Sequence, residues 1–154
     1  MPTINIFPVL ARALALGGAY ESLELVGVPY RDIDDACSGT RGPLLRRYYL
    51  LFEPARHVYL HHLLRSDDDR HFHDHPWSFS TFLLTGAYIE HTPDGATRQP
   101  QGAFLERPAI WRHWLELEQP VWTLVITGPY ERDWGFWTPT GFVSHRNYAA
   151  AGCE

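Results

Sequence analysis

The pattern of apolar positions changes near residue 45 and predicts two unequal parts of the chain. Residues 5–17 carry leucine and alanine at helical spacing and end at Gly17-Gly18, which predicts one short helix with a glycine terminator. From Tyr48 onward, short runs rich in β-branched and aromatic residues are each closed by Gly, Pro or Asp. This second pattern is typical of strands, so we expect an all-β fold with a short N-terminal helix.

Several segments carry the strand pattern, and the connections between them are short. They span residues 46–53, 56–65, 79–90, 103–107, 111–117, 121–128 and 134–137. Pro93-Asp94-Gly95 is a strong hairpin signal. Many strands with short connections indicate a sandwich or a barrel. Since no linker is visible, residues 1–154 are expected to form one domain, with a helical or irregular lead-in over 1–45 and a β-barrel over 46–148.

Composition and charge narrow the classes of partner. The chain is 45% apolar and 14% aromatic, which is unlike a disordered protein. All 13 basic residues are arginine and the formal net charge is -5, so the basic surface needed for nucleic acid or an anionic membrane is missing. With two cysteines and no secretory or membrane-spanning pattern, a cytoplasmic location is expected.

Three alternate histidines, His71, His73 and His75, are the candidates for chemistry. Alternate side chains of an extended segment leave the same face about 6.5–7 Å apart, so two neighbours can converge on one ion. Imidazole is a common ligand for Zn, Fe, Cu and Ni. A site built from a sheet needs a ligand from another strand, and His113, which lies in a strand-like run, is a candidate.

The second half of the chain, roughly residues 57–148, resembles the cupin superfamily. The first superfamily motif is His-x-His, three or four residues, Glu, six residues, Gly, and the second is Gly, five residues, Pro-x-Gly, two residues, His. The chain matches these motifs at His73, His75 and Gly86, and at Gly102, Pro108 and His113. The register with Gly86 selects His73 and His75 over His71. The strings HDHPWSF, LTGAYIE, WTLVITG and WGFWTPTGF further resemble small bacterial and phage cupins of largely uncharacterised function.

This resemblance implies a double-stranded β-helix, also called a jelly-roll barrel, with one divalent metal ion and a homodimeric assembly. Two positions depart from the motifs: Phe79 replaces the glutamate ligand, and Ile110 replaces a glycine. Without the carboxylate, the site becomes a neutral three-histidine site that resembles the thiol dioxygenases of the superfamily more than its four-ligand oxidoreductases. Such a site keeps open positions for a small-molecule substrate or oxygen.

The function favoured by these patterns is that of a mononuclear non-haem Fe(II)-type oxygenase, although Zn, Ni and Mn also suit imidazole ligands. The alternative is a non-catalytic cupin that binds a small ligand and has a structural or vestigial metal site. A metal-independent sugar epimerase would require a His–Asp pair for acid–base catalysis. The chain offers His61 and His62 with Asp67 to Asp69, but nothing in the sequence ties them together.

Catalytic residues cannot be assigned from the sequence, but a substrate pocket can be outlined. Its candidate residues are Phe79, Tyr88, Trp111, Arg65 and His71. Strand parity would place Trp111 on the face of His113. An arginine near the histidines, such as Arg65, Arg107 or Arg112, would suit a substrate carboxylate. Asp74, of opposite parity to its histidine neighbours, is expected to be a surface turn residue.

Overall fold

The computed structural model describes residues 28–34, 41–68 and 70–152, and their strands form three antiparallel sheets. The helix predicted over residues 5–17 lies outside the described residues. The elements are β1 (Tyr30–Ile33), β2 (Leu45–Glu53), β3 (Arg56–Leu63), β4 (Phe72–His73), β5 (Phe79–Thr85), β6 (Tyr88–Thr92), β7 (Gly95–Gln99), β8 (Phe104–Arg107), β9 (Trp114–Leu117), β10 (Val121–Thr127), β11 (Gly135–Thr138), β12 (Gly141–Ser144) and α2 (His145–Gly152).

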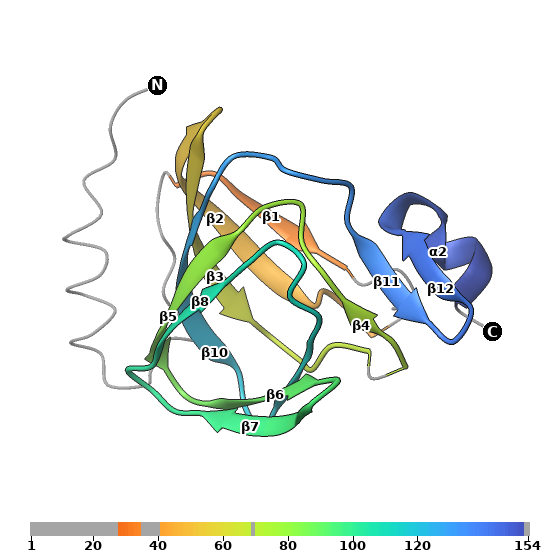
Figure 1. Ribbon diagram of the computed structural model, residues 1–154. Coiled ribbons are helices and arrows are strands. Elements are labelled where there is room, and N and C mark those ends of the chain that lie inside the picture. The colour runs from red at the N-terminus through yellow and green to blue at the C-terminus, as the bar shows by residue number, and fades with distance from the viewer. Residues whose placement is uncertain (1–27, 35–40, 69, 153–154) are drawn as a thin grey trace.

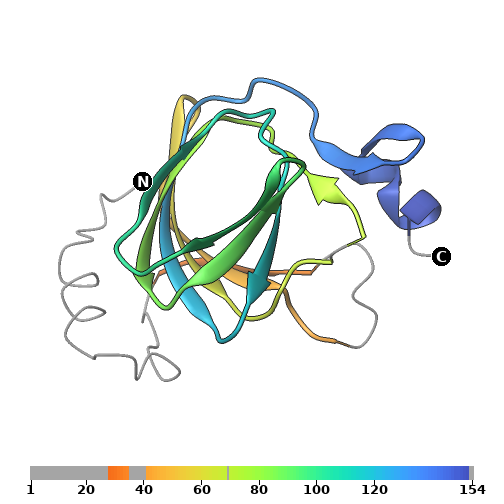
Figure 2. The same cartoon turned by 60° about the horizontal axis from the view of Figure 1, so that its bottom comes forward.

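The largest sheet forms one wall of a barrel. Its strand order is β1-β2-β3-β10-β5-β8, while the two smaller sheets have the orders β7-β6-β9 and β12-β11-β4. Figure 1 shows β6 and β7 below the large sheet, and β11, β12 and α2 together at one side. Figure 2 shows the strands curling round a common interior. The all-β fold expected from the strand pattern is therefore confirmed.

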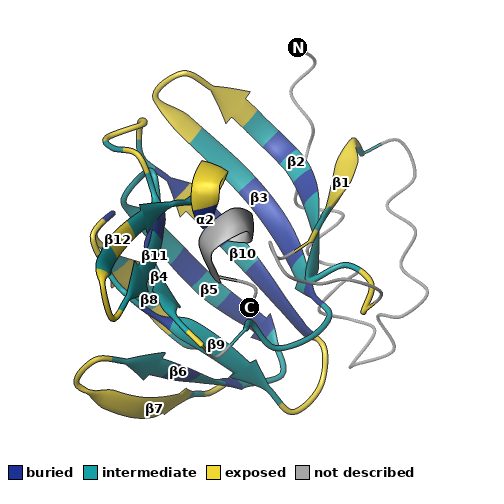
Figure 3. Cartoon of the chain, turned by 90° about the vertical axis from the view of Figure 1, so that its right-hand side faces the viewer, coloured by how far each residue is buried: buried dark blue, intermediate teal, exposed yellow. Residues whose placement is uncertain are grey.

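The two faces of the large sheet bury different apolar sets. The inner face carries Leu63, Leu83 and Val121, which pack with residues of β6 and β9 that include Tyr88. The outer face carries a second cluster that consists of Tyr48, Leu50, Leu60, Leu84 and Trp122. Because successive side chains of a strand point to opposite faces, β3, β5 and β10 are buried on both sides, as Figure 3 shows. This double burial explains the mostly apolar sequences of β5 and β10, FSTFLLT and VWTLVIT.

The inner face becomes polar along the strands away from Leu63. Arg47 of β2 pairs with His61 of β3, and His61 pairs with Thr123 of β10. Residues directly opposite one another on paired strands project to the same side. His61, Thr123 and Thr81 are buried, so the barrel interior contains polar groups beside its apolar core.

The predicted strands correspond to observed ones, with differences that have local causes. Segment 79–90 is divided into β5 and β6 at Gly86, whose φ is +73°. Segment 111–117 begins its strand only at Trp114, because residues 108–111 form a turn closed by a hydrogen bond from the Trp111 amide to the Pro108 carbonyl, 2.9 Å long.

Strands β1, β4, β7 and β12 were not expected from the sequence. β7 has the sequence GATRQ and is almost fully exposed, so it has no apolar alternation to reveal it. β1 falls in the lead-in that was expected to be helical or irregular. The hairpin predicted at Pro93-Asp94-Gly95 is present, joining β6 to β7 with Thr92 opposite Gly95. No helix within the described ranges is long and apolar enough to span a bilayer.

Gly86 offers a test of the bend between β5 and β6. A Cβ atom at this position would lie 3.1 Å from Cγ2 of Val121 and would also require a left-handed backbone. Gly86→Ala is expected to lower the free energy of unfolding by about 2–3 kcal/mol. Alanine is strained in a left-handed backbone, and its Cβ atom would be packed too closely against Val121. Gly102→Ala is the matched control, because Gly102 has a φ of +84° but open space around its Cβ position. Equal losses for the two variants in urea unfolding would contradict this account.

Candidate metal centre

Three histidines from two separate segments of the chain meet inside the barrel. His73 ends β4, and His113 immediately precedes β9. The two residues form a β-bridge, in which each amide donates to the other's carbonyl at 2.9 and 3.0 Å. The His75 amide donates to the carbonyl of Ala109 at 3.0 Å. Backbone hydrogen bonds therefore hold both histidines of the His-x-His segment against the segment that carries His113.

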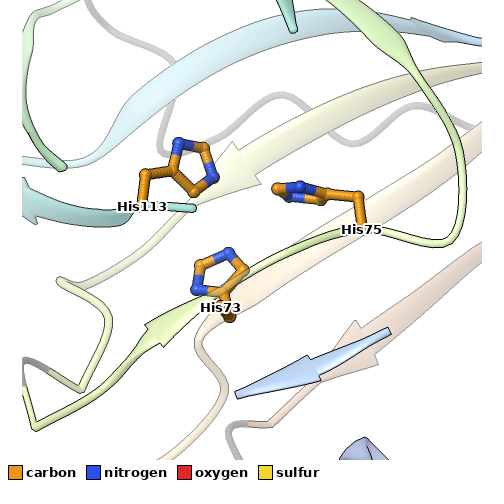
Figure 4. Close-up of side chains that lie close together, drawn as sticks. All are labelled: His73, His75 and His113. Atoms are coloured by element: carbon orange, nitrogen blue, oxygen red, sulfur yellow. The ribbon is translucent and has the colours of Figure 1, made fainter. Parts of the chain in front are cut away.

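The three side chains form a compact cluster. One nitrogen from each ring can be chosen so that all three lie within 4.8 Å of one another. The ring centroids are 5.2 Å apart for His73 and His75, 4.9 Å for His73 and His113, and 5.0 Å for His75 and His113. Figure 4 shows the rings facing a common point. Among the described residues, no carboxylate belongs to this cluster.

Glu90 on β6 lies behind His113. Its Oε1 atom lies 2.8 Å from Nδ1 of His113. The two carboxylate oxygens of Glu90 also accept hydrogen bonds from Trp111, Arg107 and Gln99. Burial raises the pKa of Glu90, but hydrogen bonds from His113 and Arg107 outweigh it and bring the pKa well below its usual range. Glu90 is thus ionised and accepts the Nδ1 proton of His113. Nε2 is therefore the ring nitrogen of His113 that can serve as a metal ligand.

Sequence reasoning missed Glu90, although one signal pointed to it. Tyr88 was selected as a pocket candidate, and Glu90 lies two positions further along the same strand, hence on the same face. Glu90 is only 2% exposed. A buried acid at that position requires partners, and no sequence pattern indicates which residues they are.

Asp74 is wholly buried, which corrects the expectation of a surface turn residue. Its carboxylate accepts hydrogen bonds from the Gly135 amide at 2.9 Å and from the Trp137 indole at 2.8 Å, and it pairs with Arg132. Its amide donates to the carbonyl of Gly135. Asp74 therefore ties the segment between His73 and His75 to β11.

The electrostatic environment favours the neutral imidazoles of His73 and His75. Burial, followed by the charge of His113, lowers the pKa of His73 well below its usual value. Burial is also the largest cause of the same lowering at His75. Nδ1 of His75 is buried and has no hydrogen-bond partner in the described part of the chain. Neutral rings with unused lone pairs are the form of histidine that binds a metal, so these residues fit a divalent ion.

Phe79 lies beside the cluster, at the position where the cupin motif has its glutamate. Its ring centroid is 4.5 Å from that of His75 and 6.3 Å from that of His113. Trp77 packs against both Phe79 and His75, at 5.8 and 5.7 Å. An apolar aromatic wall therefore borders the imidazoles on this side. Phe79 and Arg107 also border a surface hollow of about 520 Å³.

The remaining pocket candidates lie in different surroundings. Trp111 contacts Glu90 through its indole and packs under the guanidinium of Arg107, although a turn rather than strand parity places it there. Tyr88 is 4% exposed and packs in the inner apolar cluster.

Arg65 and His71 make contacts elsewhere in the molecule. The Arg65 guanidinium donates to the carbonyl of Gly42, so it is engaged with the loop before β2. Nδ1 of His71 lies 2.8 Å from the hydroxyl of Tyr148 on α2. His71 is thus directed to the helix, whereas His73 and His75 join the cluster.

Comparison with known proteins identifies the fold. An RmlC-like cupin from Shewanella frigidimarina matches with a TM-score of 0.54 and 13% identity, over 69% of this chain and 87% of that one. The Fe(II) form of HppE matches with a TM-score of 0.53 and 12% identity, over 68% of this chain and 58% of that one. No family model matches the sequence, and no curated protein matches it. The chain has the cupin fold, while its closer likeness to small bacterial and phage cupins stays a prediction.

Asp74 is expected to be a major source of stability around the cluster. Asp74→Ala leaves the Gly135 amide and the Trp137 indole without their acceptor, so the free energy of unfolding should fall by about 2–4 kcal/mol. Asp133→Ala is the control, because the side chain of Asp133 is 43% exposed. Urea unfolding of both variants provides the measurement, and a loss at Asp74 no larger than at Asp133 would refute the proposed role.

Proposed function

We propose that this chain binds one divalent metal ion through His73, His75 and His113 and acts as a mononuclear non-haem Fe(II)-type oxygenase on a small molecule. The observation that carries the proposal is the convergence of three imidazoles within 4.8 Å, with an ionised Glu90 behind one of them. A bound Fe(II) ion would supply the redox chemistry with dioxygen that no side chain provides.

The chain's own residues would prepare and protect this site. Glu90 fixes the tautomer and orientation of His113, an outer contact that typically changes metal affinity by about 10–100-fold. Asp74 holds the backbone between the other two ligands against β11. Phe79 and Trp77 place apolar rings beside His75, which limits the access of water. These contacts favour a small organic substrate over a charged polymer.

One structural neighbour supports iron as the metal. The HppE structures are described as Fe(II) complexes, one of them with the alternative substrate (S)-1-HPP. The cupin fold can therefore hold Fe(II) next to a small molecule. At 12% identity this likeness does not extend to the substrate.

A non-catalytic ligand-binding protein with a structural metal is the second candidate. It is favoured by the position of the cluster, because an ion there would link β4 of one small sheet to the segment before β9 of another. A structural metal would stabilise the fold strongly, while a catalytic metal could be removed with little effect on folding. Thermal unfolding with and without metal separates the two cases.

His113→Ala should weaken metal binding severely. The variant removes one ligand, so the Kd for Zn(II), used as a redox-inert probe, should rise at least about 100-fold, beyond the usual effect of an outer contact. Competition with a chromogenic chelator measures it. His91→Ala is the control, because the His91 ring stacks on Trp114 at 3.7 Å and is not part of the cluster. Unchanged Zn(II) affinity in His113→Ala would rule out the three-histidine site.

Catalysis has its own test. Protein loaded anaerobically with Fe(II) should consume oxygen in the presence of at least one member of a panel of thiols, amino acids and catechols. The His113→Ala variant, treated identically, sets the background. Tight metal binding without oxygen consumption for any panel member, together with a large stabilisation by metal, would favour the structural alternative.

A further inference from the structure

Arg47 introduces a positive charge to the inner face of the barrel wall. It lies on β2 directly opposite His61 of β3, so the two side chains share the inner face. Its Nε atom donates to Nε2 of His61 at 2.9 Å, and its guanidinium carbon lies 4.5 Å from the ring centroid of Tyr59. His61 and Tyr59 are 7% and 3% exposed. The cation is therefore held in place by buried groups.

The partners of Arg47 are neutral, unlike those of several other arginines. Carboxylates pair with Arg46, Arg70, Arg107 and Arg132. Burial, followed by the charge of Arg47, lowers the pKa of His61 well below its usual value, so His61 accepts the hydrogen bond as a neutral ring. No carboxylate contacts Arg47 among the described residues, and its cross-strand neighbour on β1 is Arg31, another cation.

Aromatic rings connect Arg47 to the metal centre. Tyr59 stacks on His61 at 5.6 Å and lies 6.5 Å from Trp77, which in turn lies 5.7 Å from His75. Arg47 is therefore linked through Tyr59 and Trp77 to His75 of the metal centre.

We propose that the small-molecule ligand of this site carries a carboxylate, which Arg47 binds while the rest of the ligand lies toward the three histidines. The inference rests on the proposed function and names the class of its substrate. A partly buried cation without a counter-ion is unfavourable, and a carboxylate from the ligand would relieve that cost. The planar guanidinium can donate two parallel hydrogen bonds to a carboxylate, which gives recognition by geometry as well as by charge.

Calorimetric titration with phenylacetate and its neutral isostere phenylacetamide tests this inference. The full chain is used after metal removal, so that coordination to an ion cannot contribute. Phenylacetate should bind at least about tenfold more tightly than phenylacetamide, a preference worth about 1.4 kcal/mol. Inorganic phosphate should bind more weakly than phenylacetate, and tighter phosphate binding would overturn the assignment of a carboxylate.

Substitutions of Arg47 test whether this residue causes the preference for phenylacetate over phenylacetamide. Arg47→Gln should abolish it, and Arg47→Lys, which keeps the charge but loses the planar fork, should retain only part of it. Arg98→Gln is the matched control on the exposed strand β7 and should behave like the wild type. Equal binding of both probes to the wild type, or a full preference in Arg47→Gln, would overturn the inference. If the wild type prefers phenylacetate through Arg47 but does not bind Zn(II), the proposed function is refuted while the carboxylate site at Arg47 is retained.

Discussion

The candidate site depends on the pair of backbone hydrogen bonds that joins His73 to His113. This bridge connects two small sheets, and it is formed by main-chain groups that any residue would provide. Side-chain identity matters only after the bridge has placed the two Cα atoms opposite one another. His75 lies two positions after His73 in an extended segment, so its side chain is on the same face. The hydrogen bond from its amide to the Ala109 carbonyl then holds it at the same point. A three-imidazole cluster thus follows from strand pairing and alternation.

The charges around this cluster are arranged in layers. The innermost groups are the three imidazole rings, and the acids lie outside them, with Glu90 on the far side of His113 and Asp74 behind the chain between the other two histidines. Each buried acid has several donors, which is the condition for burying a carboxylate without great cost. Arg47 is the exception, as a cation at the inner wall whose described partners are all neutral.

The sequence predicted much of this structure, and the reasons for its success and failure are local. Short apolar runs separated by turn residues indicated an all-β fold, because the central strands are buried and their ends carry turn residues. The spacing of His73, His75 and Gly86 identified the histidine segment. Glu90 escaped notice because it lies 23 positions from His113 and reaches it only through the pairing of β6 with β9. The burial of Asp74 likewise depends on β11, far along the chain, and strand parity was the wrong basis for placing Trp111 because a turn precedes His113.

The most direct measurement is X-ray diffraction from crystals of metal-loaded protein, recorded on both sides of the absorption edge of the metal. We expect a single anomalous difference peak between the rings of His73, His75 and His113. A peak elsewhere, or none in protein shown by elemental analysis to contain the metal, would rule out the three-histidine centre.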